Sequence, residues 1–343
     1  MQRRQFIQQV ALAMGAMRTA GSAKARGSNG ILGHGPRRYR LNAGWSKAIP
    51  ALNPVKDCHE MVMDNGGRLL LLTNETRNNV LVYSRSGQVL EAWGTHYPGA
   101  HGLTHFDANG EEWLFITDTS RHQVFKTNLQ GKVLLTLSYP NQVEAYTQAT
   151  QFIPTETAIA PNGDIYVADG YGLDFIIQYN AAGQYIRHFG GRGPGPQHLL
   201  NAHGICIDLR SPNGPSLLVS SRQQQCFKRF TLQGQYVETI SLPGAWVCRP
   251  VIKGPYLYTA VLQTHARQGQ QSGFVLVLNA QNQVVSSIGG NLPATGQPDE
   301  ESLYQTLQVF SYPHDVCIDN DDNLYVAQWN SGQVYPYQLI PAA

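Results

Sequence analysis

The chain of 343 residues repeats one pattern six times, and this repeat limits its fold more than any other feature of the sequence. Each copy opens with a polar residue followed by an apolar strand, and Gly, Asn or Asp turns separate it from further apolar segments. The six copies open at 58–64, 100–104, 154–159, 202–208, 248–252 and 313–319. Self-similarity at a spacing of about 40 to 50 residues indicates structural units that stack against one another.

Each opening is followed by three more strand-like segments. The turn and second strand are clear in 162–169, the third strand and its turn in 80–87, and the fourth strand often ends in an aromatic residue and glycine, as at Phe189-Gly190. Four strands per repeat are typical of a propeller blade, because each blade buries its faces only against its neighbours. The sequence therefore predicts an all-β fold, a six-bladed β-propeller with blades resembling NHL repeats, over residues 51–343.

Composition agrees with one closed domain of short strands. The chain has 34 Gly, 19 Pro and 17 Tyr but only 14% charged residues, which suits turns and pleated surfaces. A net charge of +2 without a basic block after the N-terminus excludes nucleic acid as a partner. No stretch approaches the roughly 20 apolar residues that cross a bilayer, so we expect no membrane span. We also expect a monomer.

The N-terminus reads as a targeting segment. Arg3-Arg4-Gln5-Phe6-Ile7 precedes a modestly apolar run over 10–17, and Ala23-Lys24-Ala25 is typical of a cleavage site. This order predicts a twin-arginine signal peptide over residues 1–25 and a periplasmic or secreted protein. Residues 26–50 are expected to form a linker to the propeller.

The cysteines give little functional signal. Their number is odd, so at least one must be free, and none forms a CxxC motif. We expect most of them to pack as small apolar side chains. They are Cys58, Cys206, Cys226, Cys248 and Cys317.

Histidines recur at one phase of the repeat. The first strand of every blade lines the central channel of a propeller, so equivalent positions in different blades converge. The blade-opening positions carry His59, His101, Thr155, His203, Arg249 and His314. Three convergent neutral imidazoles with an open position are the usual ligands of catalytic Zn²⁺, and imidazole also suits other divalent metals. The sequence therefore predicts a metal site at one mouth of the channel.

Four short motifs resemble the lyase domain of peptidylglycine amidating enzymes. They are the segments 98–104, 122–126, 169–171 and 312–315. The resemblance runs over all six blades, and it implies a six-bladed propeller that cleaves peptidyl-α-hydroxyglycine into an amide and glyoxylate.

The same resemblance implies ligands for two metals. Zn²⁺ is expected on His101, His203 and His314. A structural Ca²⁺ is expected on Asp315 and the main-chain carbonyl of Leu103, with the carbonyl of Met61 as a further ligand, because a hard cation takes oxygen ligands.

Two further residues match positions of catalytic groups in this family. Tyr171 stands where the family has a tyrosine that acts on the substrate hydroxyl, and Arg222 stands at a family arginine position. A tyrosine base has an unperturbed pKa of about 10, so it needs positive charge nearby. Zn²⁺ and Arg222 are the expected sources of that charge.

The chain also departs from the family pattern. Asn74 occupies a place where another catalytic arginine is expected, and Arg77 follows three residues later. His59 is an additional histidine at the mouth of the channel. As a fourth ligand it would close the coordination position that catalysis needs.

These observations leave three hypotheses for function. The first is a metal-dependent lyase acting on a small-molecule or peptide α-hydroxyamide. The second is a non-catalytic NHL-repeat binding module or metal-holding propeller, since a fold alone does not imply chemistry. The third is a lactonase-like propeller hydrolase, against which the histidine-rich ring argues because such enzymes use Glu, Asn and Asp ligands.

Overall fold

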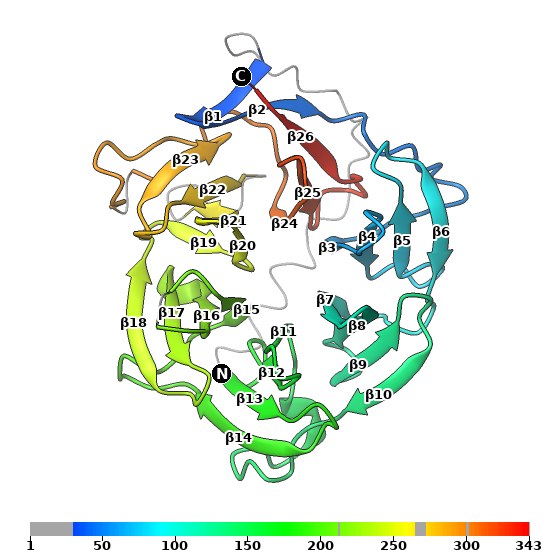
Figure 1. Cartoon of the computed structure of the whole chain (residues 1–343), viewed down its shortest axis with the longest axis vertical. Coiled ribbons are helices and arrows are strands. Elements are labelled where there is room, and N and C mark those ends of the chain that lie inside the picture. The colour runs from blue at the N-terminus through cyan, green and yellow to red at the C-terminus, as the bar shows by residue number, and fades with distance from the viewer. Residues whose placement is uncertain (1–29, 212, 265–271, 300–301, 343) are drawn as a thin grey trace, which may run out of the picture.

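Six β-sheets surround a central axis in the computed structural model (Figure 1). The structure describes residues 30–211, 213–264, 272–299 and 302–342, so the expected signal peptide over residues 1–25 lies outside the described residues. The described part contains β-strands, two 3₁₀ turns and no α-helix. The prediction of an all-β six-bladed propeller is confirmed.

The blades open where the repeat predicted. The strands nearest the axis are β3 (Cys58–Met63), β7 (Ala100–Ala108), β11 (Glu156–Ile159), β15 (Ala202–Asp208) and β24 (Pro313–Ile318), together with β19 (Ala245–Val247) and β20 (Val251–Lys253) in the fifth blade. The fifth blade is the least regular, because its inner edge is split and both pieces pair with β21 (Tyr256–Thr264).

The other strands follow outward by antiparallel pairing. The second strands are β4 (Leu69–Thr73), β8 (Glu111–Asp118), β12 (Ile165–Ala168), β16 (Ser216–Ser221), β21 and β25 (Leu324–Gln328). The third strands are β5 (Val80–Tyr83), β9 (Gln123–Asn128), β13 (Phe175–Tyr179), β17 (Cys226–Thr231), β22 (Phe274–Leu278) and β26 (Tyr337–Pro341). Five outer strands are β6 (Val89–Trp93), β10 (Val133–Leu137), β14 (Tyr185–Gly190), β18 (Tyr236–Ser241) and β23 (Val284–Ile288). The 3₁₀ turns are η2 (Ala149–Gln151) and η3 (Arg222–Gln224).

The propeller is closed by strands from both ends of the chain. β2 (Arg37–Asn42) pairs with β26 as the fourth strand of the last blade, and β1 (Ile31–His34) adds a fifth. Residues 26–50 were expected to be a linker, but this segment contains both strands. The correction has a physical reason: without β2, the last blade would expose the outer edge of β26 to water.

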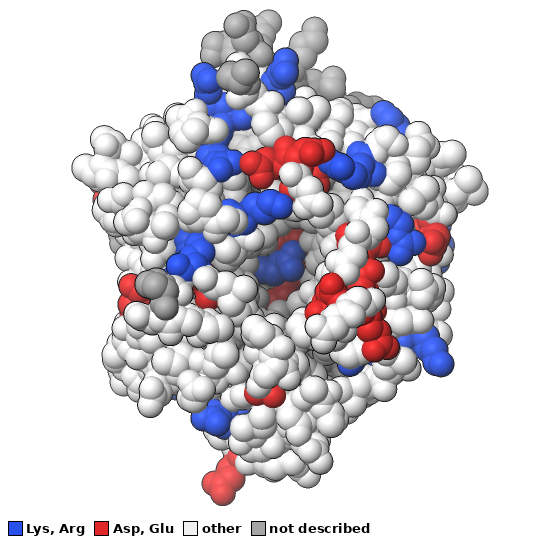
Figure 2. All heavy atoms as spheres, viewed as in Figure 1, with Lys and Arg blue, Asp and Glu red and all other residues white. Residues whose placement is uncertain are grey.

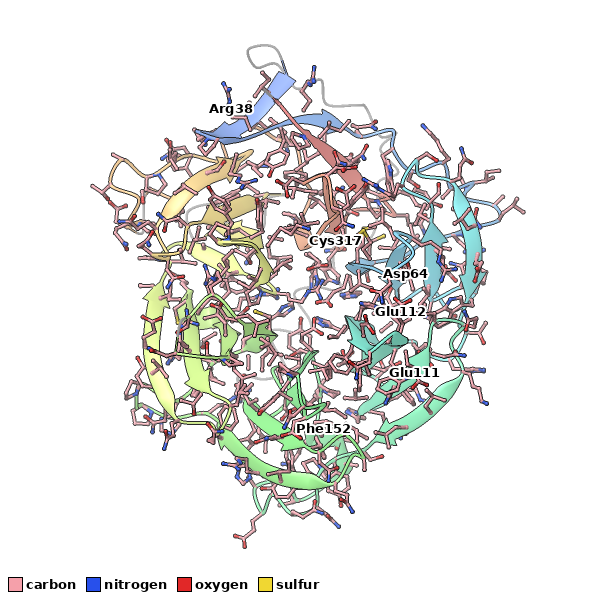
Figure 3. The ribbon with its side chains drawn as sticks, viewed as in Figure 1. Arg38, Asp64, Glu111, Glu112, Phe152 and Cys317 are labelled. Atoms are coloured by element: carbon pink, nitrogen blue, oxygen red, sulfur yellow. The ribbon has the colours of Figure 1, made fainter. Side chains whose placement is uncertain are left out.

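The hydrophobic core lies between adjacent blades. Every residue of β4, β12 and β16 is buried, because both faces of these strands pack against neighbouring blades. At the closure, the Trp45 ring lies 5.0 Å from Tyr83 of the first blade and 4.8 Å from Tyr325 of the last, measured between ring centroids. The same cluster includes Cys317, which lies on β24 (Figure 3). None of the five cysteines is disulfide-bonded.

Among the described residues, no helix is both long and apolar enough to cross a bilayer.

Candidate metal centre and catalytic residues

All four channel histidines lie at irregularities in their strand pairing. The register between first and second strands shifts between Cys58 and Glu60, between Ala100 and Leu103, between Ala202 and Ile205, and between Pro313 and Asp315. The third blade, which carries Thr155 before its inner strand, pairs without such a shift. A β-bulge re-aims the side chain of the extra residue, and these bulges direct His59, His101, His203 and His314 toward the axis.

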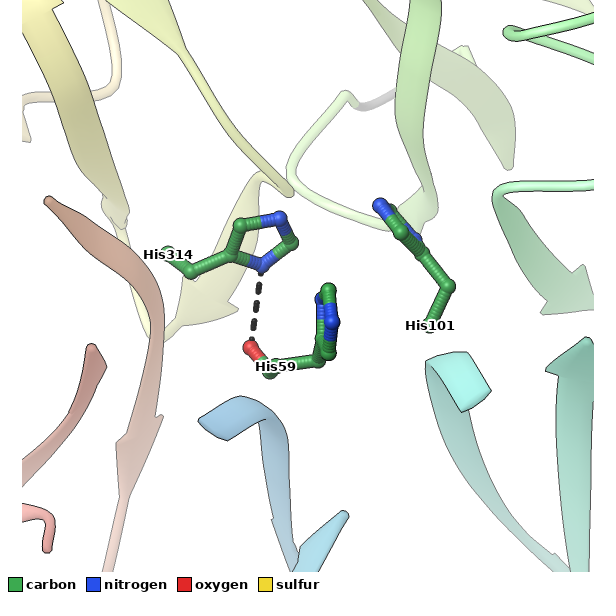
Figure 4. A group of neighbouring side chains, drawn as sticks. All are labelled: His59, His101 and His314. Carbon is green, nitrogen blue, oxygen red and sulfur yellow. Dashed lines mark hydrogen bonds between the residues drawn. The ribbon is translucent and has the colours of Figure 1, made fainter. Parts of the chain in front are cut away.

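The four imidazoles form one buried cluster. Ring centroids are 4.7 Å apart for His101 and His203, 4.8 Å for His203 and His314, and 4.8 Å from His59 to both His101 and His314. Figure 4 shows the rings of His59, His101 and His314 converging from three different strands. One ligand atom from each of these three lies within 4.8 Å of the others. The histidines could therefore hold a metal ion, as the repeat phase predicted.

Main-chain carbonyls orient two of the rings. The Nδ1–H of His101 donates to the carbonyl of Thr155 at 2.8 Å, and the Nδ1–H of His314 donates to the carbonyl of His59 at 3.0 Å. A carbonyl can only accept, so both neutral rings carry their proton on Nδ1 and leave Nε2 unprotonated, with a lone pair that can accept a hydrogen bond or bind a metal. Such bonds from the distal nitrogen are the usual support of metal-binding histidines.

The other two rings hold nitrogens without partners. Both ring nitrogens of His203 and the Nδ1 of His59 are buried without a hydrogen bond. Each unsatisfied buried polar group costs about 1–3 kcal/mol unless something else binds it. A metal ion bound by these nitrogens would offset that cost, so the donor set fits the expected cofactor.

The electrostatic environment keeps the rings neutral. Burial, with smaller effects from Arg222 and Lys56, lowers the pKa of His59 to about 3. Burial first, and then neighbouring charges, also hold the pKa of His101, His203 and His314 well below the ordinary value. Neutral imidazole is the form that binds metal. The lowered pKa values therefore keep all four histidines in the protonation state that metal binding requires.

Tyr171 reaches this cluster from the loop after β12. Its hydroxyl lies 3.0 Å from Nε2 of His101. The residue as a whole is 39% exposed, but its hydroxyl end is directed into the cluster. Burial raises the pKa of the Tyr171 hydroxyl, and the charge of Arg222 and a hydrogen bond from it act in the opposite direction.

The loop that carries Tyr171 requires glycine on both sides. A Cβ at Gly170 would lie 2.0 Å from the carbonyl oxygen of Ala202, and a Cβ at Gly172 would lie 2.1 Å from Oδ1 of Asp169. Glycine is therefore required before the tyrosine by the close approach of the Ala202 backbone, and after it by the close approach of the Asp169 carboxylate.

Asp169 anchors the same loop, a role that the sequence analysis missed. Its carboxylate accepts hydrogen bonds from the main-chain N–H of Ile153 and Leu173, each at 2.6 Å, and from the hydroxyl of Tyr146 at 2.5 Å. Burial raises the pKa of Asp169 to about 7, although these three hydrogen bonds oppose that rise. In the sequence, Asp169 is marked only by its place two residues before Tyr171. Its partner Tyr146 lies 23 residues earlier in the chain, between β10 and β11, so no local motif joins the two.

Arg222 lies close enough to the cluster for its charge to lower the pKa of His203, whereas Arg77 lies in an exposed loop. The Arg222 side chain is buried in η3 and donates to the carbonyl of Val247 and to Sγ of Cys248. Asn74 is paired with Asp57 through two hydrogen bonds. Arg77 pairs with Glu75 in its own loop and its side chain is 66% exposed, so it does not replace the arginine expected at position 74.

The oxygens predicted to bind Ca²⁺ have a different partner. Arg249 donates to the carboxylate of Asp315 at 2.7 and 3.1 Å, to the carbonyl of Met61 at 3.0 Å and to that of Leu103 at 3.2 Å. The predicted calcium ligands Asp315 and Leu103 are brought together, but their oxygens do not fit a Ca²⁺ ion while a guanidinium lies among them. This prediction is corrected for this chain.

Residues 157–337, more than half of the chain, match the family model described as a 6-bladed beta-propeller. The chain belongs to this propeller family.

The propeller is similar to amidating lyases in sequence. It is 29% identical over 280 residues to peptidyl-α-hydroxyglycine α-amidating lyase 1 of Drosophila melanogaster, a match that covers 74% of this chain and 47% of that protein. The chain thus spans about half the length of this curated relative. The resemblance to the amidating lyase family is confirmed at this level.

Two other matches describe the fold more than the chemistry. NHL repeat-containing protein 3 of Homo sapiens is 23% identical over 310 residues, covering 87% of this propeller and 84% of the human protein. A streptogramin B lyase structure superposes with a TM-score of 0.56 at 10% identity, over 88% of this chain and 96% of that one. At such low identity the structural likeness shows the fold alone.

Proposed function

We propose that this propeller is an exported, metal-dependent lyase that cleaves a peptidyl-α-hydroxyglycine, or a similar α-hydroxyamide, into an amide and glyoxylate. The observation that carries this proposal is the position of the Tyr171 hydroxyl, 3.0 Å from a ring nitrogen within a buried cluster of neutral imidazoles. The similarity to amidating lyases supports the same reaction class. Export is proposed from the twin-arginine motif at Arg3-Arg4.

His101, His203 and His314 are proposed to hold Zn²⁺, with His59 beside them. When bound, this ion supplies Lewis acidity at the substrate hydroxyl and a positive charge beside Tyr171. The fit rests on the unprotonated Nε2 atoms of His101 and His314 and on the unpartnered nitrogens of His203.

Tyr171 is proposed as the general base. Its oxygen takes the proton of the substrate hydroxyl, and the electron pair of that O–H bond forms the carbonyl of glyoxylate as the C–N bond breaks. The proton then passes from Tyr171 to the departing nitrogen, which leaves as the amide. Because burial raises the pKa of the Tyr171 hydroxyl, ionisation requires the positive charge of Arg222 and of a bound cation.

Release of glyoxylate tests the proposal directly. The exported protein is purified without added chelator, its metals are measured by elemental analysis, and an N-acyl-α-hydroxyglycine is supplied as substrate. Near-stoichiometric metal and glyoxylate formation that stops after chelation are expected. Stoichiometric metal with no glyoxylate from any N-acyl-α-hydroxyglycine would contradict the lyase.

One observation favours a second candidate, a propeller that holds a metal without turning over substrate. The group of three residues whose ligand atoms lie within 4.8 Å of one another is His59, His101 and His314. The lyase assignment instead places the metal on His101, His203 and His314. Four imidazole ligands would leave no position for substrate. If His59→Ala gains lyase activity that the native protein lacks, the native site is a closed one.

The lactonase-like hypothesis has less support in the channel. Carboxylates do occur on the inner strands, at Glu60, Glu156 and Asp315, but Arg249 lies among them.

Export has its own test: replacing Arg3-Arg4 with two lysines should leave the protein in the cytoplasmic fraction of the native host.

A further inference from the structure

A second buried polar cluster lies in the channel beside the histidines. The carboxylates of Glu60, Glu156 and Asp315 come from three blades, and each residue is at most 1% exposed. Glu60 and Asp315 directly follow ring histidines, and Glu156 follows Thr155. Figure 2 shows the hollow at the centre of the propeller, with basic atoms at its base and acidic atoms next to them. The cluster needs a cation, because buried carboxylates without a counter-charge are costly.

Arg249 provides that cation from the fifth blade. Its guanidinium lies 2.7 Å from Asp315, 3.7 Å from Glu60 and 3.9 Å from Glu156, measured between nitrogen and carboxylate oxygen. The carbonyls of Met61 and Leu103 accept its remaining hydrogen bonds. The guanidinium is thus surrounded by oxygen atoms from blades one, two, three and six.

The fourth blade makes room for this side chain. A Cβ at Gly204 would lie 2.5 Å from Cα of Arg249, so only glycine allows the inner strands to approach at this point. Every other blade therefore contacts Arg249 or an oxygen that it binds. A cavity of about 250 Å³ is lined by Arg249 with Thr104, Thr157 and Cys206.

Carboxylate and main-chain carbonyl oxygens are the ligands of a hard divalent cation, whereas the neighbouring imidazoles suit Zn²⁺. Oε2 of Glu156 is buried and lies 3.9 Å from Nε of Arg249, beyond hydrogen-bond distance.

We propose that Arg249 is a built-in replacement for a divalent cation at the propeller axis, and that the native protein folds without Ca²⁺ because this guanidinium occupies the oxygen cage. The inference does not depend on the proposed lyase activity. It has a direct consequence: removing the guanidinium while keeping the cage converts it into a Ca²⁺ site.

The experiment compares the native protein with Arg249→Ser. Thermal unfolding is followed after chelation and again with excess Ca²⁺, and Ca²⁺ binding is measured by calorimetry on Zn²⁺-loaded protein. The native Tm is expected to be unchanged by Ca²⁺. The Tm of R249S is expected to fall by about 5–10 °C after chelation, because three buried carboxylates lose their partner, and to recover with one Ca²⁺ bound per chain.

Arg229→Ser is the matched control. Arg229 is also a partly buried arginine paired with carboxylates, those of Asp208 and Glu238, but it lies on β17 away from the axis. R229S should lose stability without recovering in Ca²⁺, which separates site-specific rescue from general stabilisation by salt.

Two results would overturn the proposal. One is tight one-to-one Ca²⁺ binding by the native protein with a rise in its Tm. The other is a folded R249S variant that neither binds Ca²⁺ nor recovers. If R249S does not fold in either condition, the native titration decides: no effect of Ca²⁺ supports the proposal, and one-to-one uptake sinks it.

Discussion

Tyr171 donates its hydroxyl hydrogen bond to Nε2 of His101, the same nitrogen that a metal ion would use. The direction follows from the proton on Nδ1 of His101, which is donated to the carbonyl of Thr155 at 2.8 Å. This hydrogen bond and metal coordination by His101 therefore exclude each other. Metal loading would release the tyrosine hydroxyl from the imidazole and leave it free to face a substrate.

Tyr171→Phe should abolish turnover while keeping metal and fold. Loss of a general base typically lowers kcat by about 10²–10⁴-fold, and the ring of phenylalanine retains the packing of the tyrosine. Glyoxylate release, zinc content and Tm are the measurements. Tyr236→Phe is the control, because its hydroxyl bonds only Thr239 on the outer strand β18. Full activity of Y171F would disprove the assigned role.

His203→Ala and His59→Ala distinguish the two possible ligand sets. If zinc is held by His101, His203 and His314, H203A loses the metal and H59A keeps it, since the unpartnered nitrogens of His203 are then ligands. Elemental analysis after dialysis measures both. The opposite result, zinc lost from H59A and kept in H203A, would assign the metal to His59, His101 and His314.

Tyr146→Phe should loosen the loop that carries Tyr171 without changing a side chain of the histidine cluster. The variant removes one of three hydrogen bonds to Asp169, at a cost of about 1 kcal/mol in the free energy of unfolding. We expect a several-fold fall in kcat with little change in KM, because Tyr171 is held less well. Tyr185→Phe, whose hydroxyl bonds His188 on an outer strand, is the control. Equal effects of both variants on kcat would show that Tyr146 has no positioning role.

Asp208 should contribute to stability in a defined acid range. Burial alone would raise the pKa of this carboxyl, but hydrogen bonds from Arg210 and Arg229 outweigh burial and hold the pKa at about 2, below the ordinary value of 3.8. A lowered pKa stabilises the fold above the unfolded value, and this contribution is lost as the pH falls from about 4 to about 2. Urea unfolding of the native protein and of Asp208→Asn, measured across that range, should show a shallower pH dependence for the variant. Parallel curves would contradict the assignment.

The sequence by itself determined the architecture and the phase of the histidines. Six copies of one strand pattern, each able to bury its faces only against a neighbour, lead to a propeller, and equivalent positions in such blades must converge on the axis. His59, His101, His203 and His314 were therefore predictable as a group, and Tyr171 and Arg222 were found through local motifs that resemble a family.

Only the tertiary structure decided which partners each of these residues has. Arg249 occupies the same repeat position as the histidines, yet its long side chain reaches the carboxylate of Asp315 and takes the place predicted for Ca²⁺. Tyr146 and Asp169 meet although they are separated by 23 residues, and β2 joins β26 across nearly the whole chain. The reason is physical. A repeat fixes where each backbone position lies. The hydrogen bonds and ion pairs of buried side chains depend instead on how long each side chain is and in which direction it points, and spacing along the chain does not encode these.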